Sequence, residues 1–272
     1  ENGSIVYSRA GTFGLDREGF IINSAGQTLT GYAADTSGNI TPVLGEMQID
    51  ASDLSPQATT SVELNMNLDN TATVPGAFDV NDSSTYNYST STTVYDSLGT
   101  AHVASLYYHK NAANDWTSYI YVGGNEISQA GGDSITFNAD GSLNQVNGGT
   151  GTTITTTSFS PDVGVSPMTI TLDIGGITQF NNPFGVNQIV QDGYSSGRLN
   201  DLDIDDEGII FGRYSNGQSK AMGQIVLTNF PNVQGLRQTG NTSWAETYDS
   251  GVAATGIPGS ASLGLIQSGS LE

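Results

Sequence analysis

Apolar and polar residues alternate along much of this chain. Segments 62–68 and 168–174 carry an apolar residue at every second position, with polar residues between them. In the segment 116–122, Trp116, Ile120 and Val122 fall on one side of the alternation and two tyrosines fall on the other. Because successive side chains of a β-strand point to opposite faces of a sheet, each segment predicts a strand with one buried face.

Turn signals separate such segments at short intervals. Asn-Gly occurs at 147–148 and 216–217, and Asp-Gly occurs at 140–141 and 192–193. Several of these pairs suit the positive φ angles of tight hairpin turns. Helical periodicity is weak throughout, and a short helix is indicated only near 233–236. Many short strands with frequent turns predict an all-β fold of the sandwich or barrel type.

One sequence pattern occurs twice. LDREGFII (15–22) and IDDEGIIF (204–211) share an apolar residue, Asp, a polar residue, Glu, Gly and then apolar residues. Both copies predict a strand, a turn and a second strand. They lie on opposite sides of a central segment of different character, so we expect the two ends of the chain to fold together.

Charge marks the limits of that central segment. Residues 59–194 carry 12 acidic residues and one basic residue, Lys110, whereas the flanks carry 15 acidic and six basic residues. We therefore predict a discontinuous inner β domain made of 1–58 plus 195–272, with a β-barrel or sandwich-like outer domain, 59–194, inserted into it. A single large sandwich is the alternative.

The composition excludes several classes of function. The formal net charge of −20 argues against nucleic acid and against anionic membrane surfaces as partners. The absence of cysteine excludes disulfides, thiolate metal sites and cysteine nucleophiles. A cysteine-free, acidic chain rich in Gly, Ser, Thr and Asn suits an extracellular bacterial protein. No signal peptide or membrane-spanning apolar run is present, and the chain opens at Glu1, so we expect a fragment.

Gly193 to Gly197, GYSSG, matches the G-x-S-x-G pattern of the hydrolase nucleophile elbow, with Ser195 as its serine. The elbow needs a helix after the serine and a histidine further along the chain. Here an alternating strand pattern follows, and both histidines, His102 and His109, precede the serine. A Gly/Ser loop is the interpretation that we prefer.

Two other groups of residues could bind a metal. Counted from Asp203, acidic residues at positions 1, 3 and 5 and Gly at position 6 resemble a calcium loop, but Tyr214 stands where the bidentate Glu is needed. An acidic hairpin turn and a weak cation site both stay open there. His102 and His109 are an odd number of positions apart and would face opposite sides of one strand. We therefore predict no catalytic, cofactor-binding or metal-binding residues and no cofactor.

The flanks resemble the axial proteins of the bacterial flagellum. YSRAGTFGLDREGF (7–20) is similar to a stretch shared by rod and hook subunits. YSNGQSKAMGQIVLTNFPNVQGL (214–236), GNTSWAET (240–247) and PGSASLGLIQSGSLE (258–272) resemble the second shared stretch, in the expected order. The family's helical terminal segments are not seen before Glu1 or after Glu272, so the resemblance implies a core fragment.

The central segment resembles the hook branch of that family. TTVYDSLGTAH (92–102), ITLDIGGITQF (170–180) and QDGYSSGRL (191–199) are similar to the hook subunit's extra outer domain and its return to the inner one. The resemblance implies a structural, non-enzymatic subunit that self-assembles into a curved tube. It also implies a universal joint between motor and filament, with export through the flagellar apparatus without a cleaved signal.

The resemblance further implies partners besides the chain itself: distal rod proteins, hook–filament junction proteins and the hook cap during assembly. Three other interpretations stay open, and each would require a different feature in the sequence. A secreted adhesin or carbohydrate-binding β-module would show tandem domains or a complete calcium site, and a hydrolase needs a histidine after Ser195. A distal rod subunit would lack the insert.

Overall fold

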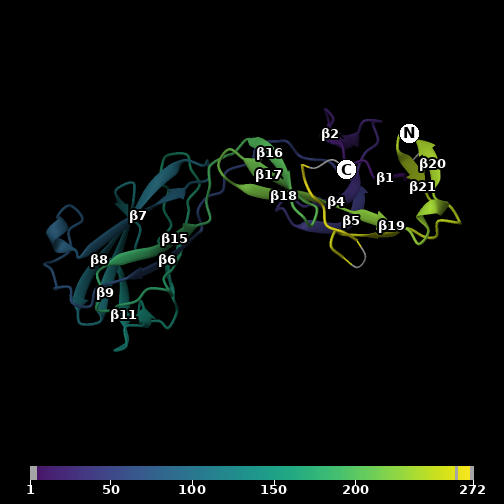
Figure 1. The fold of residues 1–272 in the computed structure, drawn as a ribbon. Helices are drawn as coiled ribbons and strands as arrows, with labels where there is room; N and C mark the ends of the chain where they lie inside the picture. Colours follow the sequence, from purple (N-terminus) through teal and green to yellow (C-terminus); the bar gives the residue numbers. More distant parts are fainter. Residues whose placement is uncertain (1–4, 261–262, 270–272) are drawn as a thin grey trace. The chain divides into compact units, whose positions relative to one another are not determined.

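The structure is a computed structural model that describes residues 5–260 and 263–269 (Figure 1). The described residues form 22 β-strands and two 3-10 helices and contain no α-helix. The all-β prediction is therefore confirmed. Residues 261–262 and 270–272 of the segment 258–272, and the two chain ends on which the expectation of a fragment depends, lie outside the described residues.

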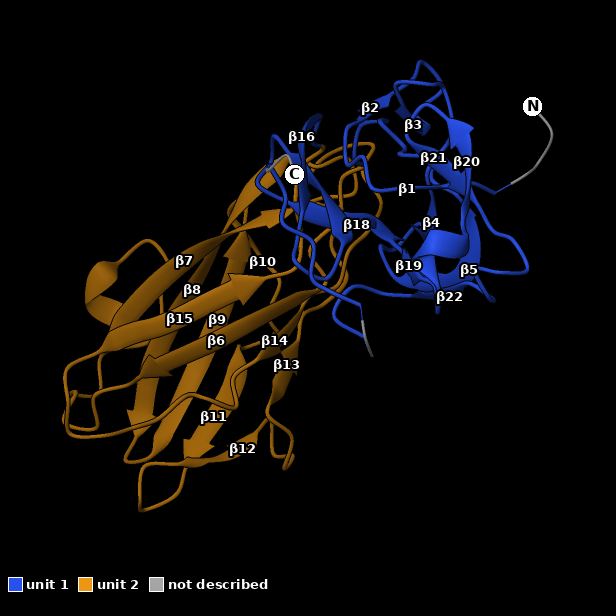
Figure 2. Ribbon diagram, turned by 45° about the vertical axis from the view of Figure 1, so that its right-hand side comes forward, with its two compact units in different colours: residues 1–54, 197–272 blue, residues 55–196 orange. Residues whose placement is uncertain are grey.

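The chain divides into two compact units (Figure 2). Unit 1 combines residues 1–54 and 197–272, and unit 2 is the continuous stretch 55–196. The range predicted for the inserted domain, 59–194, lies inside unit 2.

Unit 2 is built from two open sheets. The first has the order β12-β11-β9-β8-β7, and β10 also pairs with β9. Its strands are β7 (Tyr88–Tyr95), β8 (Ala101–Ala112), β9 (Asp115–Val122), β10 (Asn125–Glu126), β11 (Asp133–Phe137) and β12 (Leu143–Val146). The second has the order β13-β14-β6-β15, with β13 (Thr153–Thr155), β14 (Thr171–Asp173), β6 (Ser61–Asn67) and β15 (Gly185–Gln191). All neighbours are antiparallel except β14 and β6.

The alternating residues of these strands form one core. Every second residue of β6 is buried, and Leu64 and Met66 are fully inaccessible to solvent. On β9, Trp116, Ile120 and Val122 are buried, whereas the tyrosines of the same strand face the other way and are half-buried. Buried residues of both sheets belong to the same cluster, so unit 2 is sandwich-like, and no closed barrel occurs among its described residues.

Unit 1 takes strands from both flanks. Its largest sheet has the order β16-β17-β18-β4-β5, where β4 (Thr30–Ala34) and β5 (Ile40–Glu46) come from the first flank. The second flank supplies β16 (Leu199–Ile204), β17 (Ile209–Tyr214) and β18 (Ser219–Ile225). A smaller sheet joins β1 (Tyr7–Ser8) to β21 (Ser243–Ala245) and β20 (Arg237–Gly240). Two pairs complete the unit: β2 (Phe13–Leu15) with β3 (Ile21–Asn23), and β19 (Leu227–Asn229) with β22 (Ala254–Gly256).

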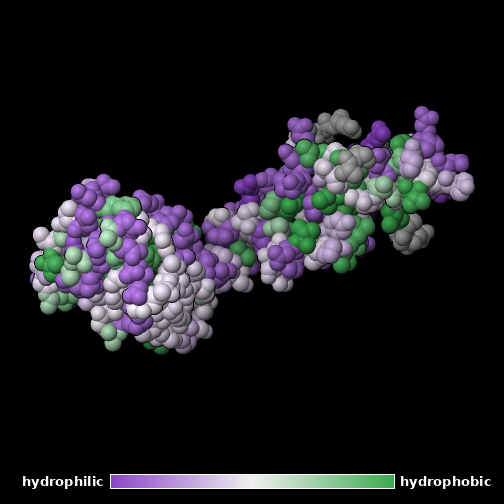
Figure 3. Space-filling model, turned by 90° about the horizontal axis from the view of Figure 1, so that it is seen from below, coloured by the Kyte–Doolittle hydropathy of each residue, from purple (hydrophilic) through white to green (hydrophobic). Residues whose placement is uncertain are grey.

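The core of unit 1 is small. Its buried cluster consists of Ile21, Met47, Ile49 and Ile210, and partly buried residues such as Met222 pack against it. Many large apolar residues of unit 1 stay exposed, namely Ile5, Phe13, Leu15, Val43, Leu44, Val233, Tyr248, Val252, Ile257 and Leu265. Hydrophobic residues also gather on unit 1 in the face drawn in Figure 3. Where such groups form a contiguous patch, the patch is typical of a surface that contacts other molecules.

Six tight turns share the pattern Asx-x-x-Gly. They are Asp16–Gly19, Asn23–Gly26, Asp35–Gly38, Asp96–Gly99, Asn138–Gly141 and Asp205–Gly208. In each turn the Gly N–H donates to the Asx carbonyl at 3.0–3.3 Å, and the Gly φ lies between 75° and 87°. Glycine adopts this conformation without a steric penalty, and the geometry is that of a hairpin turn closed by a glycine bulge. The two copies of the repeated pattern are thus two of six examples, and both connect paired strands as predicted.

The short helix indicated near 233–236 is present as a single 3-10 turn. Residues Val233–Gly235 form the 3-10 helix η2, and a second 3-10 helix, η1, spans Ser83–Thr85. No helix among the described residues is long and apolar enough to span a membrane.

Candidate functional site

Ser195 lies in an extended segment and not on a strand-to-helix turn. Tyr194 on one side of it pairs with Gln57, and Gly197 on the other side pairs with Leu54. The next element is the strand β16. The segment therefore lacks the helix whose N-terminus a nucleophile elbow uses. The GYSSG pattern instead lies where the chain leaves unit 2 and re-enters unit 1.

The turn expected at Asp192-Gly193 does not form. The Asp192 carboxylate instead accepts hydrogen bonds from the N–H groups of Thr60 and Ser61 at 2.8 and 3.0 Å and from the Thr60 hydroxyl at 2.5 Å. Burial raises the pKa of Asp192, but these hydrogen bonds outweigh it and hold the pKa below its usual value. A Cβ on Gly193 would lie 2.2 Å from the Thr59 hydroxyl, so glycine is needed for close approach and not for a positive φ.

The two histidines lie on β8 and face opposite sides of the sheet. His102 Nε2 is 2.8 Å from Asp96 Oδ2. Asp96 is 1% exposed and also accepts the N–H groups of Leu98 and Thr100. Burial opposes ionisation of Asp96, but these hydrogen bonds lower its pKa overall. The Asp96–His102 pair therefore fixes the turn between β7 and β8.

The acidic run near Asp203 forms a turn and an ion pair. Asp203 bonds to the Arg213 guanidinium on the neighbouring strand, which lowers the Asp203 pKa. The Asp205 carboxylate points into its own turn and accepts the Ile209 N–H at 2.8 Å. Of the two interpretations of this run, the hairpin turn matches the structure. No group of three or more His, Cys, Asp or Glu side chains among the described residues is arranged to hold a metal ion.

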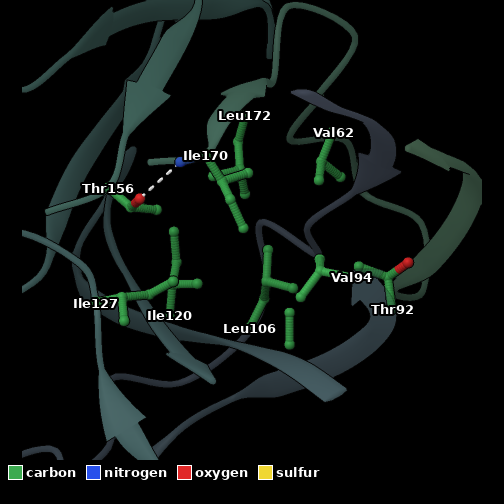
Figure 4. Close-up of a pocket in the computed structure, with 10 residues that line it drawn as sticks. Val62, Thr92, Val94, Leu106, Ile120, Ile127, Thr156, Ile170 and Leu172 are labelled. Atoms are coloured by element: carbon green, nitrogen blue, oxygen red, sulfur yellow. Dashed lines mark hydrogen bonds between the residues drawn. The ribbon is translucent and has the colours of Figure 1, made fainter. Parts of the chain in front are cut away.

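The core of unit 2 contains a small cavity lined by apolar side chains such as Val62, Leu106 and Ile120 (Figure 4). Two threonines also line it, and the Thr156 hydroxyl accepts the Ile170 N–H at 3.0 Å. A ligand site needs convergent polar groups that fix the ligand's orientation. This space is a packing gap between the two sheets.

Several interactions that organise unit 2 had no signal in the sequence. Lys110 is 5% exposed, and its Nζ donates to the carbonyls of Asn70 and Ala72. The same ammonium lies 5.5 Å from the centroid of the Trp116 ring. The sequence shows Lys110 only as a charge, because its partners lie 38 and 40 positions away.

The comparisons with known proteins agree on one family. The family model "Flagellar basal body protein FlaE D2 domain" matches residues 67–194. The flagellar hook protein FlgE of Salmonella typhimurium is 36% identical over 286 aligned positions that span 100% of this chain and 68% of the relative. The Escherichia coli hook protein is 35% identical over 100% of this chain and 68% of its own length. The Borreliella burgdorferi hook protein is 30% identical over 100% of this chain and 67% of its own length.

One solved structure has the same fold. The crystal structure of Helicobacter pylori flagellar hook protein FlgE2 matches with a TM-score of 0.66 and 13% identity, covering 91% of this chain and 87% of that chain. At that identity the match speaks for the fold alone. The relatives above carry the assignment, because their similarity runs through both units: the chain belongs to the flagellar hook protein family.

Proposed function

We propose that copies of this subunit assemble into a curved tube that acts as a universal joint and passes motor torque to the filament. As a member of the flagellar hook protein family, the chain is a structural subunit of the hook, and the family polymerises into the hook. The observation that carries the proposal is the 36% identity through the whole chain, both units included. An adhesin, a carbohydrate-binding module or a rod subunit is not favoured.

The two parts of the chain would occupy different layers of the tube. We assign the discontinuous part, 1–58 plus 195–272, to the middle layer and the inserted part, 59–194, to the outer layer. The outer assignment is supported by the family model, which covers 67–194. Strands from both flanks share one five-stranded sheet, which supports treating the flanks as one domain.

The surface chemistry suits a joint that bends. A bending tube needs contacts between subunits that slide and re-form, and polar hydrated interfaces permit this better than dry apolar ones. Only 12% of the residues are charged, and the sequence is rich in small polar residues and in glycine, of which it has 35. The subunit would then hold its neighbours through many weak contacts.

Location, partners and chemistry follow from the same proposal. The subunit would be exported without a cleaved signal peptide and act outside the cell. It would contact the distal rod, the hook–filament junction and, during assembly, the hook cap. It would carry out no catalysis and use no metal or cofactor, in agreement with the extended backbone around Ser195.

Gene replacement tests the proposal. Deleting the full-length gene should abolish hooks in electron micrographs and swimming in soft agar, and the wild-type gene should restore both. A Ser195→Ala gene should restore both equally well. Normal hooks in the deletion strain would contradict the proposal. A Ser195→Ala protein that folds with the wild-type stability but forms no hooks would contradict the absence of catalysis.

A further inference from the structure

Five aromatic residues gather on the outer face of the six-stranded sheet of unit 2. Tyr107 on β8 and Tyr119 and Tyr121 on β9 form its base, and Tyr107 and Tyr119 are direct cross-strand neighbours. Phe78 stacks on Tyr119 with ring centroids 3.7 Å apart, and Tyr86 meets Tyr107 edge-on at 4.9 Å. All five side chains are half-buried. We call this set the tyrosine patch.

A carboxylate borders the tyrosine patch. Glu126 on β10 is the cross-strand neighbour of Tyr121, whose hydroxyl lies 3.4 Å from Glu126 Oε2. The Ser128 hydroxyl donates to Glu126 Oε1 at 2.8 Å, which fixes the carboxylate. Burial and the charge of Glu126 raise the pKa of Tyr119 and of Tyr121, so both phenols stay neutral. Aromatic rings beside a carboxylate are suited to a guanidinium group, which stacks on rings and pairs with the acid.

Unit 2 has no cation of its own for this patch. Its single Lys or Arg residue, Lys110, is buried and bonded to two carbonyls. Unit 1 holds the other six basic residues. Three of them, Arg9, Arg17 and Arg237, are exposed and form no ion pair within the described residues.

Arg17 is accompanied by apolar side chains that would match the aromatic rings. It lies in the turn after β2, on which Phe13 and Leu15 are 40% and 46% exposed. Alternate residues of a strand share a face, so Phe13 and Leu15 point the same way. Two acidic residues share the hairpin. The Asp16 carboxylate accepts hydrogen bonds from the N–H groups of Glu18 and Phe20. Glu18 is therefore the acidic side chain of the hairpin that does not hold this turn.

We propose that the β2–β3 hairpin of one copy docks on the tyrosine patch of a neighbouring copy, with Arg17 stacked on the rings and paired with Glu126. The inference rests on the proposed function, because it assigns one subunit contact in the hook. A contact between two different surfaces repeats from copy to copy, and it gives a closed ring or an open helical filament according to the rotation between copies. Such a contact is what a helical tube requires.

Cysteine crosslinking in assembled hooks tests the contact. The sequence has no cysteine, so Arg17→Cys and Glu126→Cys can be placed together in the full-length protein. A short bismaleimide should then join the subunits of isolated hooks into a ladder of multimers. Each single variant should give no ladder. The pair Arg17→Cys and Asp173→Cys is the matched control, because Asp173 is exposed on the other sheet, and it should also give none.

Charge exchange gives a second test with a specific rescue. Arg17→Glu and Glu126→Arg should each speed the depolymerisation of isolated hooks about two- to fivefold, the range expected for one exposed guanidinium contact. The double exchange should restore the wild-type rate. Arg237→Glu is the control, because it reverses the charge of another unpaired arginine. Combining Arg237→Glu with Glu126→Arg should not restore the wild-type rate of depolymerisation.

The outcomes separate the two hypotheses. Hooks that form normally but give no multimer ladder, or only a crosslink within one chain, overturn the docking inference and leave the proposed function standing. Single charge variants that depolymerise at the wild-type rate also overturn it. A deletion strain that still forms hooks overturns the proposed function itself.

Discussion

Replacing Lys110 by methionine tests whether its buried ammonium stabilises unit 2. Methionine keeps most of the unbranched stem that packs beside Trp116 but removes the charge. The carbonyls of Asn70 and Ala72 lose their donor, and a hydrogen bond from a charged donor is worth roughly 1.5–3 kcal/mol. The lost cation–π contact adds roughly 0.5–2 kcal/mol.

Two terms oppose this loss. The variant has no ammonium to bury, so folding no longer bears a desolvation cost that is several kcal/mol for a buried ion. Asn70 is exposed, so water can also reach its carbonyl once the lysine is gone. We therefore expect a net loss of about 2 kcal/mol, which corresponds to roughly 4–8 °C in the melting temperature of a unit of this size.

The two tryptophans make the measurement selective. Trp116 is fully buried in unit 2, and Trp244 lies in unit 1. In a Trp244→Phe background, urea unfolding followed by fluorescence reports on unit 2 alone. The same substitution at the other lysine, Lys220→Met, is the matched control and should leave the Trp116 transition unchanged.

The refuting result is equally specific. A Lys110→Met protein as stable as Lys220→Met, with an unchanged dependence on urea, would mean that the cost of burying the ammonium cancels its contacts. The lysine would then be neutral for stability, and the segment it touches would be held by packing alone.

Four further outcomes are expected. Burial raises the pKa of Asp133, so the folded state holds this proton to a higher pH than the unfolded chain does, and stability falls as the pH rises from about 4 through the raised pKa. Asp133→Asn should remove that fall and stabilise unit 2 at pH 7 in urea titrations. A Cβ on Gly99 would meet a neighbouring side chain at 2.7 Å, whereas one on Gly26 meets nothing within 4 Å, so Gly99→Ala should lower the melting temperature clearly more than Gly26→Ala, although both have positive φ. Residues 55–196 expressed alone should unfold cooperatively with a β-type circular dichroism spectrum, and a random-coil spectrum would contradict this. Added chelator should leave the melting temperature within about a degree; a drop of several degrees would show that a bound cation stabilises the folded state.

Alternation along the sequence predicted strands well where one face of a sheet is buried. Val62, Leu64, Met66 and Leu68 were expected on one face and are all nearly inaccessible. The prediction works because a two-residue period is imposed by the backbone itself. It was less exact in segment 168–174, where the residues are buried as expected but the strand β14 spans only Thr171–Asp173.

The turns show why some motifs are visible in one sequence and others are not. The copies at Asp16 and Asp205 were found because their middle residues are also alike. The turn at Asp96 obeys the same rule with unrelated middle residues, since only the Asx carbonyl and side chain and the positive φ of the glycine are needed. A search for Asx-x-x-Gly between alternating segments would have found all six.

Contacts between distant residues cannot be derived this way. Asp192 and Thr60 are 132 positions apart, and the Asp-Gly pair suggested a turn because a local rule cannot know that Thr60 lies beside it. The tyrosine patch repeats the lesson at the surface. Alternation placed Tyr119 and Tyr121 on the outer face, but it could not predict that Phe78 stacks there or that Glu126 borders the rings. Period and motif describe one chain, so neither can pair a residue of one copy with a residue of another, and the proposed contact between Arg17 and Glu126 could be inferred only from the two folded surfaces.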